Sequence, residues 1–267
     1  MTAIMTTDHP AWAEYGEGVC ARAVRTSGGA WVVSWDATGL RMRCVSGTED
    51  AKPVAVTTDP GVLPRTVPDE LRTGLLALGP SQRLANPWLW DAITTAILRQ
   101  VVQAAQARKL YRRWCASYGS SLDSSFGPLA LAPTPGQVLA LTDDDFAVVG
   151  AKFHRSVLRS AAEHYARYAV HWTGMNAAEL ADALTDVPRI GPWTAAAAAT
   201  DFTGDFSIYP HDDLAVRTWA AKIAPSYSWP GKKDKTFGPK WTGMAGSDST
   251  NLHTLTLSTL TWGSHAR

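Results

Sequence analysis

The spacing of apolar residues changes near residue 69, and this change constrains the fold more than any other feature of the sequence. Before it, residues 18–46 alternate apolar and polar positions, with turn signals at SGG and DATG. This pattern predicts three short antiparallel strands joined by hairpins. After it, apolar residues recur at helical spacing in one segment after another. We therefore expect a mainly α-helical protein with a small N-terminal antiparallel β region.

Helices are expected over residues 69–79, 86–100, 101–119, 134–141, 142–150, 151–170, 176–187 and 206–224, with a further alanine-rich helix that starts near residue 194. Asn86 is the expected N-cap of its helix, with Pro87 at the first helical position. Phe153, Val157 and Leu158 are expected on one buried face of the helix that contains them.

Three domain segments are expected: a β-rich domain over 1–75, a helical core over 76–224, and a segment over 225–267 that completes the helical domain. A chain of 267 residues is long enough for one large domain or two smaller ones. Residues 47–68 and 225–251 have the composition of loops. The stretch 251–262 fits either a strand or a threonine-rich helix.

Composition excludes several classes of protein. The net charge is only +1, so any surface that attracts nucleic acid must be local. The three cysteines are far apart, which excludes a disulfide framework, a C-x-x-C metal site and a four-cysteine iron–sulfur cluster. No apolar run is long enough to span a membrane, and a secretory leader is not expected at the N-terminus. We expect a cytoplasmic, nucleoid-associated monomer.

The segment Val187–Phe202, VPRIGPWTAAAAATDF, joins two expected helices through a turn that contains two prolines and a glycine. Val187 and Ile190 should pack on the core, and Gly191 permits a positive φ or a close approach to the backbone. The helix behind the turn presents free N–H groups and the positive end of its dipole, which suits a phosphate. An ordinary structural turn is the alternative.

This segment resembles the helix-hairpin-helix of the HhH-GPD DNA glycosylases, whose pattern is Leu-Pro-Gly-Ile-Gly-x-x-Thr-Ala. The matching residues are Pro188, Ile190, Gly191, Thr194 and Ala195. Arg189 stands where the family has its first glycine, and it either contacts phosphate with its own charge or points to solvent. The resemblance covers roughly residues 84–224 and implies a DNA glycosylase fold.

The resemblance also implies a catalytic aspartate about 20 residues after the hairpin, and Asp213, Val216 and Arg217 match the family pattern in YPHDDLAVRTW. A fixed carboxylate stabilises the positive charge that develops on the sugar when an N-glycosidic bond breaks. It can also orient or deprotonate the attacking water. The alternative role of Asp213 is that of an N-cap, with Asp212 as a cap or a supporting residue.

Trp193 stands where relatives that also cleave the DNA backbone carry a lysine, whose amine forms a Schiff base with C1′. Hydrolysis without lyase activity is therefore expected. Trp193 resembles the aromatic residue that stacks on the flipped base in the AlkA-like 3-methyladenine glycosylases, which suits an electron-poor alkylated purine. Trp262 matches a second pocket aromatic. Packing beneath the hairpin is the alternative role of Trp193.

The same resemblance assigns DNA contacts to three more residues. Gln100 and Val101 match a loop between two helices in which an apolar residue fills the gap left by the flipped base. Val101 could instead be a core residue. Lys152 belongs to a basic turn with His154 and Arg155, for which a solvated surface is the alternative.

The sequence thus predicts a monofunctional DNA glycosylase that excises a damaged base, expected to be an alkylated purine, from duplex DNA. No metal or cofactor is expected, although the family hairpin also holds a monovalent cation through main-chain carbonyls. Two alternatives stay open: a glycosylase for an oxidised or mismatched base, and a non-catalytic DNA-binding protein that kept the hairpin.

Overall fold

The computed structural model describes residues 3–231 and 233–265. About 51% of the chain is helical, and an antiparallel sheet lies near the N-terminus, which confirms a mainly α-helical protein with a small N-terminal β region. The chain divides into two compact units, each assembled from separate segments. One unit comprises Met1–Asp8, Ala55–Leu84 and Gly204–Arg267, and the other comprises His9–Val54 and Ala85–Thr203. The expected domains are consecutive segments of the chain, whereas each compact unit combines segments that are far apart in the sequence.

The unit His9–Val54/Ala85–Thr203 begins with a four-stranded antiparallel sheet. Its order is β2(Ala13–Glu14), β3(Cys20–Thr26), β4(Gly29–Asp36), β5(Gly39–Gly47). The three longer strands are those expected over residues 18–46. Gly29 is required at the first turn, because a Cβ there would lie 1.9 Å from the Ser46 carbonyl oxygen. Small apolar side chains of β3 and β4 pack against Leu129 and Leu131, next to the short hairpin β8(Ser121–Leu122) and β9(Leu129–Ala130).

The helices of this unit are α2(Leu89–Leu98), α3(Ala104–Tyr118), α4(Pro135–Ala140), α5(Asp143–Val148), α6(Arg155–Trp172), α7(Ala177–Leu184) and α8(Pro192–Thr203), with the 3-10 turns η1(Glu49–Ala51) and η3(Lys152–His154). Every residue of α2 is buried, and α2 contacts both α6 and α8. Thr134 and Thr142 form capping boxes at α4 and α5, at the residues where the sequence predicts these two helices to begin. Gly119 ends α3 as expected.

Two local predictions in this unit are wrong. Asn86 is not an N-cap, because α2 begins at Leu89 with Trp88 as its cap. The buried Asn86 amide instead donates hydrogen bonds to the carboxylates of Asp91 (3.1 Å) and Asp201 (2.9 Å). Phe153 does not share the buried face of α6, since it lies before that helix in η3 and is 69% exposed.

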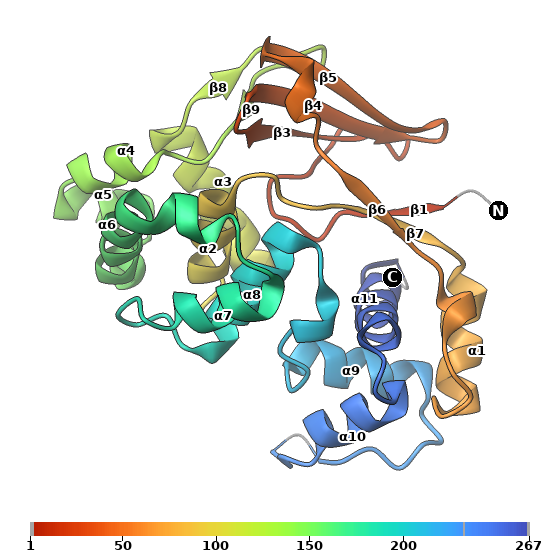
Figure 1. Cartoon of the computed structure of the whole chain (residues 1–267). Helices are drawn as coiled ribbons and strands as arrows, with labels where there is room; N and C mark the ends of the chain where they lie inside the picture. Colours follow the sequence, from red (N-terminus) through yellow and green to blue (C-terminus); the bar gives the residue numbers. More distant parts are fainter. Residues whose placement is uncertain (1–2, 232, 266–267) are drawn as a thin grey trace. The chain divides into compact units, whose positions relative to one another are not determined.

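The other unit contains a mixed sheet of order β1(Ile4–Thr6), β7(Ser81–Leu84), β6(Ala55–Thr58), in which β1 runs parallel and β6 antiparallel to β7. Its helices are α1(Asp69–Leu78), α9(Leu214–Ile223), α10(Phe237–Ala245) and α11(Ser249–His265), with the 3-10 turns η2(Pro60–Val62) and η4(Phe206–Ile208). The long helix α11 contacts α1, α9 and α10 (Figure 1). These contacts bury Trp241, Leu255 and Leu257.

Two loop predictions are wrong here, and one open alternative is settled. Residues 47–68 contain β6 and two 3-10 turns, and the segment 225–251 contains α10. The stretch 251–262 is helical, because the Thr254, Thr256 and Thr259 side chains are buried in α11 beside the leucines. Within the described residues, no helix combines the length and apolar character needed to cross a membrane.

Candidate functional site

The turn between α7 and α8 carries its unusual backbone conformation at Arg189, which has a φ of +72°. Of the two roles expected of Gly191, the positive φ is not found, since Gly191 is absent from the positive-φ residues of the described chain, and a close approach to its backbone is the role that stays a prediction. Gly191 is exposed, and a Cβ added to it would meet nothing within 4 Å. Its lack of a side chain therefore leaves open space next to the backbone. Val187 and Ile190 are buried, as predicted.

Arg189 holds a left-handed conformation that costs a non-glycine residue roughly 1–2 kcal/mol. Its guanidinium donates a hydrogen bond to the Ser156 hydroxyl at the start of α6, and its carbonyl accepts one from the Gln100 amide at 3.4 Å. The carbonyls of Val187 and Gly191 also accept one hydrogen bond each. A carbonyl oxygen has two lone pairs, so these oxygens keep capacity for a cation.

The loop between α2 and α3 is tied to the hairpin by Gln100. Its side-chain amide donates to the Thr194 hydroxyl at 2.8 Å, and Thr194 is buried in the first turn of α8. The next residue, Val101, has a φ of +56° and is 83% exposed. The alternative of a core valine is therefore wrong. A β-branched side chain in this conformation is rare and marks a constrained position.

The turn η3 lies against the same loop. His154 is buried, and its Nε2–H donates to the Gln100 carbonyl at 3.4 Å. Burial lowers the pKa of His154, and the Gln100 carbonyl opposes this shift. Lys152 is exposed, and so is Phe153. Sequence reasoning placed Phe153 in the core, although its position between Lys152 and His154 in a basic turn was a signal of exposure.

Trp193 is the second residue of α8 and is half-buried. It therefore follows the hairpin directly, on the helix whose N-terminus was expected to face phosphate. Helix α8 begins at Pro192, two residues earlier than expected, and it contains no lysine. No primary amine extends from this helix.

In the unit that contains α9, Asp213 is the N-cap of that helix. Its Oδ1 accepts the Ala215 N–H at 2.7 Å, which confirms the capping role. Its Oδ2 accepts the phenolic O–H of Tyr209 at 3.2 Å. Asp213 is half-buried. The carboxylate is thus held at both oxygens at the positive end of the α9 dipole, where negative charge is favoured.

Asp212 points to different partners, as expected for a neighbour of the helix cap, and it is not itself the cap. Its Oδ1 lies 2.6 Å from Nη2 of Arg217 and accepts the Gly238 N–H at 2.9 Å. Arg217 also donates to the carbonyls of Gly231 (3.1 Å) and Asp234 (2.8 Å). Its guanidinium lies 4.4 Å from the centre of the Phe237 ring.

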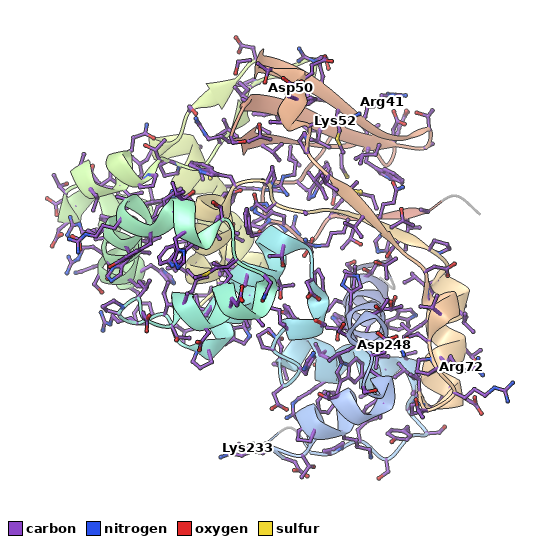
Figure 2. The ribbon with its side chains drawn as sticks, viewed as in Figure 1. Arg41, Asp50, Lys52, Arg72, Lys233 and Asp248 are labelled. Carbon is purple, nitrogen blue, oxygen red and sulfur yellow. The ribbon has the colours of Figure 1, made fainter. Side chains whose placement is uncertain are left out.

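We call this set of contacts the Arg217 clasp: Asp212, Arg217, Gly231, Asp234 and Phe237. It joins the first turn of α9 to the segment before α10, from which Lys233 projects (Figure 2). The sequence motif contained Arg217, but nothing in a local pattern indicated that its partners lie in the tail.

Trp262 is half-buried on α11, and its ring centre lies 6.5 Å from that of Trp219 on α9. Gly263 permits this packing, because a Cβ there would lie 2.3 Å from the Trp219 ring. The structure therefore places Trp262 and Asp213 in the same unit. Gln100, Arg189 and Thr194 are joined to one another in the other unit.

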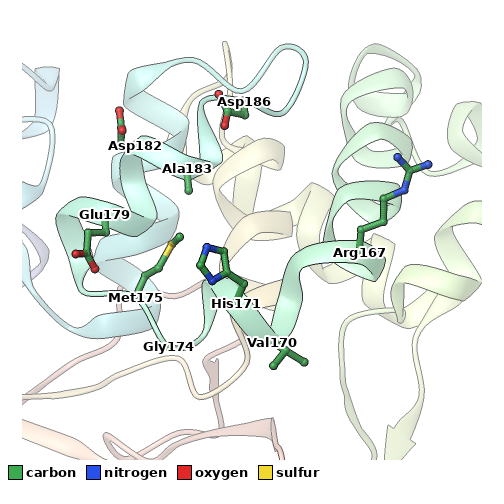
Figure 3. Close-up of a pocket in the computed structure, with 9 residues that line it drawn as sticks. All are labelled: Arg167, Val170, His171, Gly174, Met175, Glu179, Asp182, Ala183 and Asp186. Carbon is green, nitrogen blue, oxygen red and sulfur yellow. The ribbon is translucent and has the colours of Figure 1, made fainter.

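A groove of about 1000 Å³ lies between the end of α6 and α7. Glu179, Asp182 and Asp186 line one side, opposite His171 and Arg167 (Figure 3). It includes none of the predicted site residues, and its three carboxylates would repel phosphate. Among the described residues, no group of three or more His, Cys, Asp or Glu side chains is placed to hold a metal ion.

No protein-family model and no curated protein matches the chain. Solved structures do match. A 3-methyladenine DNA glycosylase from Archaeoglobus fulgidus is 15% identical, with a TM-score of 0.72 over 97% of this chain and 92% of that one. MBOgg1, solved with a low-affinity DNA ligand, is 12% identical, with a TM-score of 0.70 over 96% and 88%.

An 8-oxoguanine glycosylase/lyase from Clostridium acetobutylicum, solved with double-stranded DNA, is 14% identical, with a TM-score of 0.66 over 96% of this chain and 88% of that one. These matches extend over nearly the whole chain, so they include both units. The chain therefore has the fold of the DNA glycosylases that its hairpin and aspartate motifs resemble.

Proposed function

We propose that this protein is a DNA glycosylase that hydrolyses the N-glycosidic bond of a damaged base in duplex DNA. The observation that carries the proposal is the Asp213 carboxylate, held by the Ala215 N–H and the Tyr209 hydroxyl at the start of α9. In the sequence, Asp213 matches the position of the family's catalytic aspartate. The shared fold with DNA glycosylases supports the same reading.

The reaction needs one preorganised negative charge. As the bond from C1′ to the base nitrogen breaks, its electron pair leaves with the base and positive charge develops on the sugar. Asp213 stabilises that charge and directs a water molecule to C1′. The water oxygen bonds to C1′, its proton passes to the carboxylate, and the products are a free base and an abasic site.

The hairpin holds the DNA backbone in this proposal. The N-terminus of α8 and the open space beside Gly191 suit a phosphate, and Arg189 and Lys152 add positive charge. Val101 enters the space that the flipped base leaves, which its exposure supports. A monovalent cation held by the carbonyls of the hairpin would add positive charge beside the phosphate.

The expected substrate in this proposal is an alkylated purine, and Trp193 and Trp262, one in each unit, are the two aromatic residues that the sequence offers for contact with the base. A cationic methylated base is electron-poor, so it stacks well on an aromatic face, and it is already a good leaving group. The position of Trp193 on a helix without lysine supports attack by water rather than by an amine. An abasic site, not a nicked strand, is then the product.

An oxidised purine is the second candidate substrate, because two matching structures carry names of the Ogg1 or 8-oxoguanine type. The two candidates predict different preferences in one assay. Purified protein is incubated with duplexes that contain 7-methylguanine, 8-oxoguanine opposite cytosine, or no lesion. Release of the base and cleavage of the strand are then measured separately, with borohydride trapping as the check for a Schiff base.

We expect release of the methylated purine without strand cleavage. Asp213→Asn should lower the single-turnover rate by about 100-fold or more, the magnitude of a lost electrostatic stabiliser. Asp248 supplies a matched control, because its Oδ1 caps α11 by accepting the Thr250 N–H at 2.8 Å. Asp248→Asn should keep the full rate. Equal rates for wild type and Asp213→Asn would contradict the catalytic assignment, and a trapped Schiff base would contradict simple hydrolysis.

A further inference from the structure

Tyr209 makes a contact with Asp213 that no part of the sequence motif anticipates. Its phenolic O–H donates to Oδ2 of Asp213 at 3.2 Å, while Oδ1 accepts the Ala215 N–H at 2.7 Å. A carboxylate that is bonded through one oxygen can still rotate about its χ2 torsion. With a partner on each oxygen, the plane of the Asp213 carboxylate is fixed.

The position of the Tyr209 ring is itself fixed by buried neighbours. Tyr209 is 5% exposed, and its ring stacks on Phe206 with centres 5.8 Å apart and an interplanar angle of 21°. The Phe206 N–H donates to Nδ1 of His253 on α11 at 3.1 Å. The Arg83 guanidinium lies 4.9 Å from the centre of the Phe206 ring. Tyr209 therefore presents its hydroxyl from a rigid support.

Each member of this support is anchored to a different element of the same unit. Arg83 on β7 is buried and lies 3.1 Å from the Asp8 carboxylate. The Nε2 atom of His253 also forms a hydrogen bond with the Thr58 hydroxyl on β6 at 3.1 Å. The chain of contacts from β6, β7 and α11 through Phe206 to Tyr209 ends at the carboxylate of Asp213.

We propose that Tyr209 is a positioning residue that sets the orientation of the Asp213 carboxylate for stabilising positive charge at C1′. The inference rests on the proposed function. Electrostatic stabilisation in an enzyme is effective when the charged group needs no reorientation as the transition state forms. The Tyr209 hydroxyl supplies that preorganisation, and its ring also fills the core next to Phe206.

Tyr209→Phe removes only the hydroxyl and keeps the stacked ring. Supporting hydrogen bonds to reactive groups are worth roughly 10- to 100-fold where they have been measured at metal sites. We expect a loss of about tenfold in the single-turnover rate of base release, with an unchanged Kd for the damaged duplex. Tyr118→Phe is the matched control, because Tyr118 donates its hydroxyl to the Asp145 carbonyl at 2.7 Å. It should keep both the rate and the Kd.

A double-mutant cycle separates positioning from packing. If Tyr209 acts through the Asp213 carboxylate, Tyr209→Phe should cause no further loss in the Asp213→Asn background. A merely structural role would give the same fractional loss in both backgrounds, and that result would overturn the inference. An unchanged rate for the single variant Tyr209→Phe would overturn it as well.

A binding measurement separates this inference from the proposed function. Duplexes carry either a cationic pyrrolidine or a neutral tetrahydrofuran in place of the damaged nucleoside. Wild type should bind the cationic duplex more tightly, and Tyr209→Phe should reduce that preference by about tenfold, while Tyr118→Phe should not. If wild type releases no base and shows no preference, both proposals fail. If wild type does both and Tyr209→Phe equals it, only the role of Tyr209 fails.

Discussion

Val101 and Arg189 hold left-handed backbone conformations, with φ values of +56° and +72°, although neither is glycine. Such positions cost stability and persist where the surroundings impose them, often at functional sites. Here the Gln100 side chain joins the Val101 loop to the hairpin of Arg189. The two strained residues thus belong to one connected surface, on which Val101 is 83% exposed.

The first prediction concerns Val101→Gly. Glycine removes a conformational cost of roughly 1–2 kcal/mol, while the greater entropy that it gives the unfolded chain costs about 0.5–1 kcal/mol, so the free energy of unfolding should rise by up to about 1.5 kcal/mol. Base release and affinity for damaged DNA should fall, because the apolar side chain is lost. Urea denaturation and single-turnover assays measure the two effects.

Val170 provides the control for Val101. It is 92% exposed but lies within helix α6, where glycine is disfavoured. Val170→Gly should therefore lower the free energy of unfolding and leave base release unchanged. If Val101→Gly behaves in the same way as Val170→Gly, Val101 has no role in DNA binding.

At the scale of elements, the Arg217 clasp joins the first turn of α9 to the tail. The Arg217 side chain is only 10% exposed, whereas the Asp212 side chain is 56% exposed. The carbonyls of Gly231 and Asp234 accept two further hydrogen bonds from the guanidinium. Because Asp213 directly follows Asp212, this clasp also holds the segment that carries the proposed catalytic carboxylate.

We predict that Arg217→Gln lowers the free energy of unfolding by about 1–3 kcal/mol, the usual effect of losing hydrogen bonds to a charged group. Trypsin should then cut faster after Lys233. Arg72→Gln is the control, because its partner Asp69 is 88% exposed and such ion pairs contribute little, about 0–1 kcal/mol. Equal tryptic rates for wild type and Arg217→Gln would show that the clasp does not order the tail.

At the scale of the whole molecule, the unit that carries Asp213 is assembled from three segments of chain. His253 on α11 connects two of these segments by hydrogen bonds. The Nδ1 atom of His253 accepts the Phe206 N–H, and the Nε2 atom of His253 lies within hydrogen-bond distance of the Thr58 hydroxyl. Burial lowers the pKa of His253, Arg83 lowers it further, and Asp205 opposes both. Burial also lowers the pKa of His211 in this unit.

These shifts predict that the protein loses stability on acidification. In the unfolded chain these histidines bind protons near the ordinary histidine pKa of about 6.5, whereas in the folded chain they bind protons only at lower pH. Their contribution to the free energy of unfolding is therefore fully present above about pH 6.5 and decreases as the pH falls below that value. Each such histidine contributes a slope of up to about 1.4 kcal/mol per pH unit. Urea denaturation between pH 5 and 8 measures the slope.

His253→Gln should flatten that slope, while also lowering stability at neutral pH through the lost hydrogen bonds. His171→Gln, at an exposed position, serves as the control. If the slope is the same for wild type and His253→Gln, protonation of His253 does not break the joint between η4, β6 and α11.

The sequence by itself determined features that depend on neighbours a few residues apart. Apolar periodicity predicted three strands of the N-terminal sheet and most helices, including α4 and α5. The hairpin motif and the spacing to Asp213 indicated the fold that the solved structures share. These signals are local because hydrogen bonds within a helix, a cap or a hairpin join residues that are close in sequence.

Only the tertiary structure decided which apolar residues are exposed and which residues support the candidate site. Phe153 lies outside its helix, Asn86 is buried against two aspartates, and Arg217 finds its partners in a tail that resembled a loop. The bond between Tyr209 and Asp213 depends on a ring held by residues from β7 and α11. Such arrangements follow from contacts between distant segments, whose energies no short window of sequence contains.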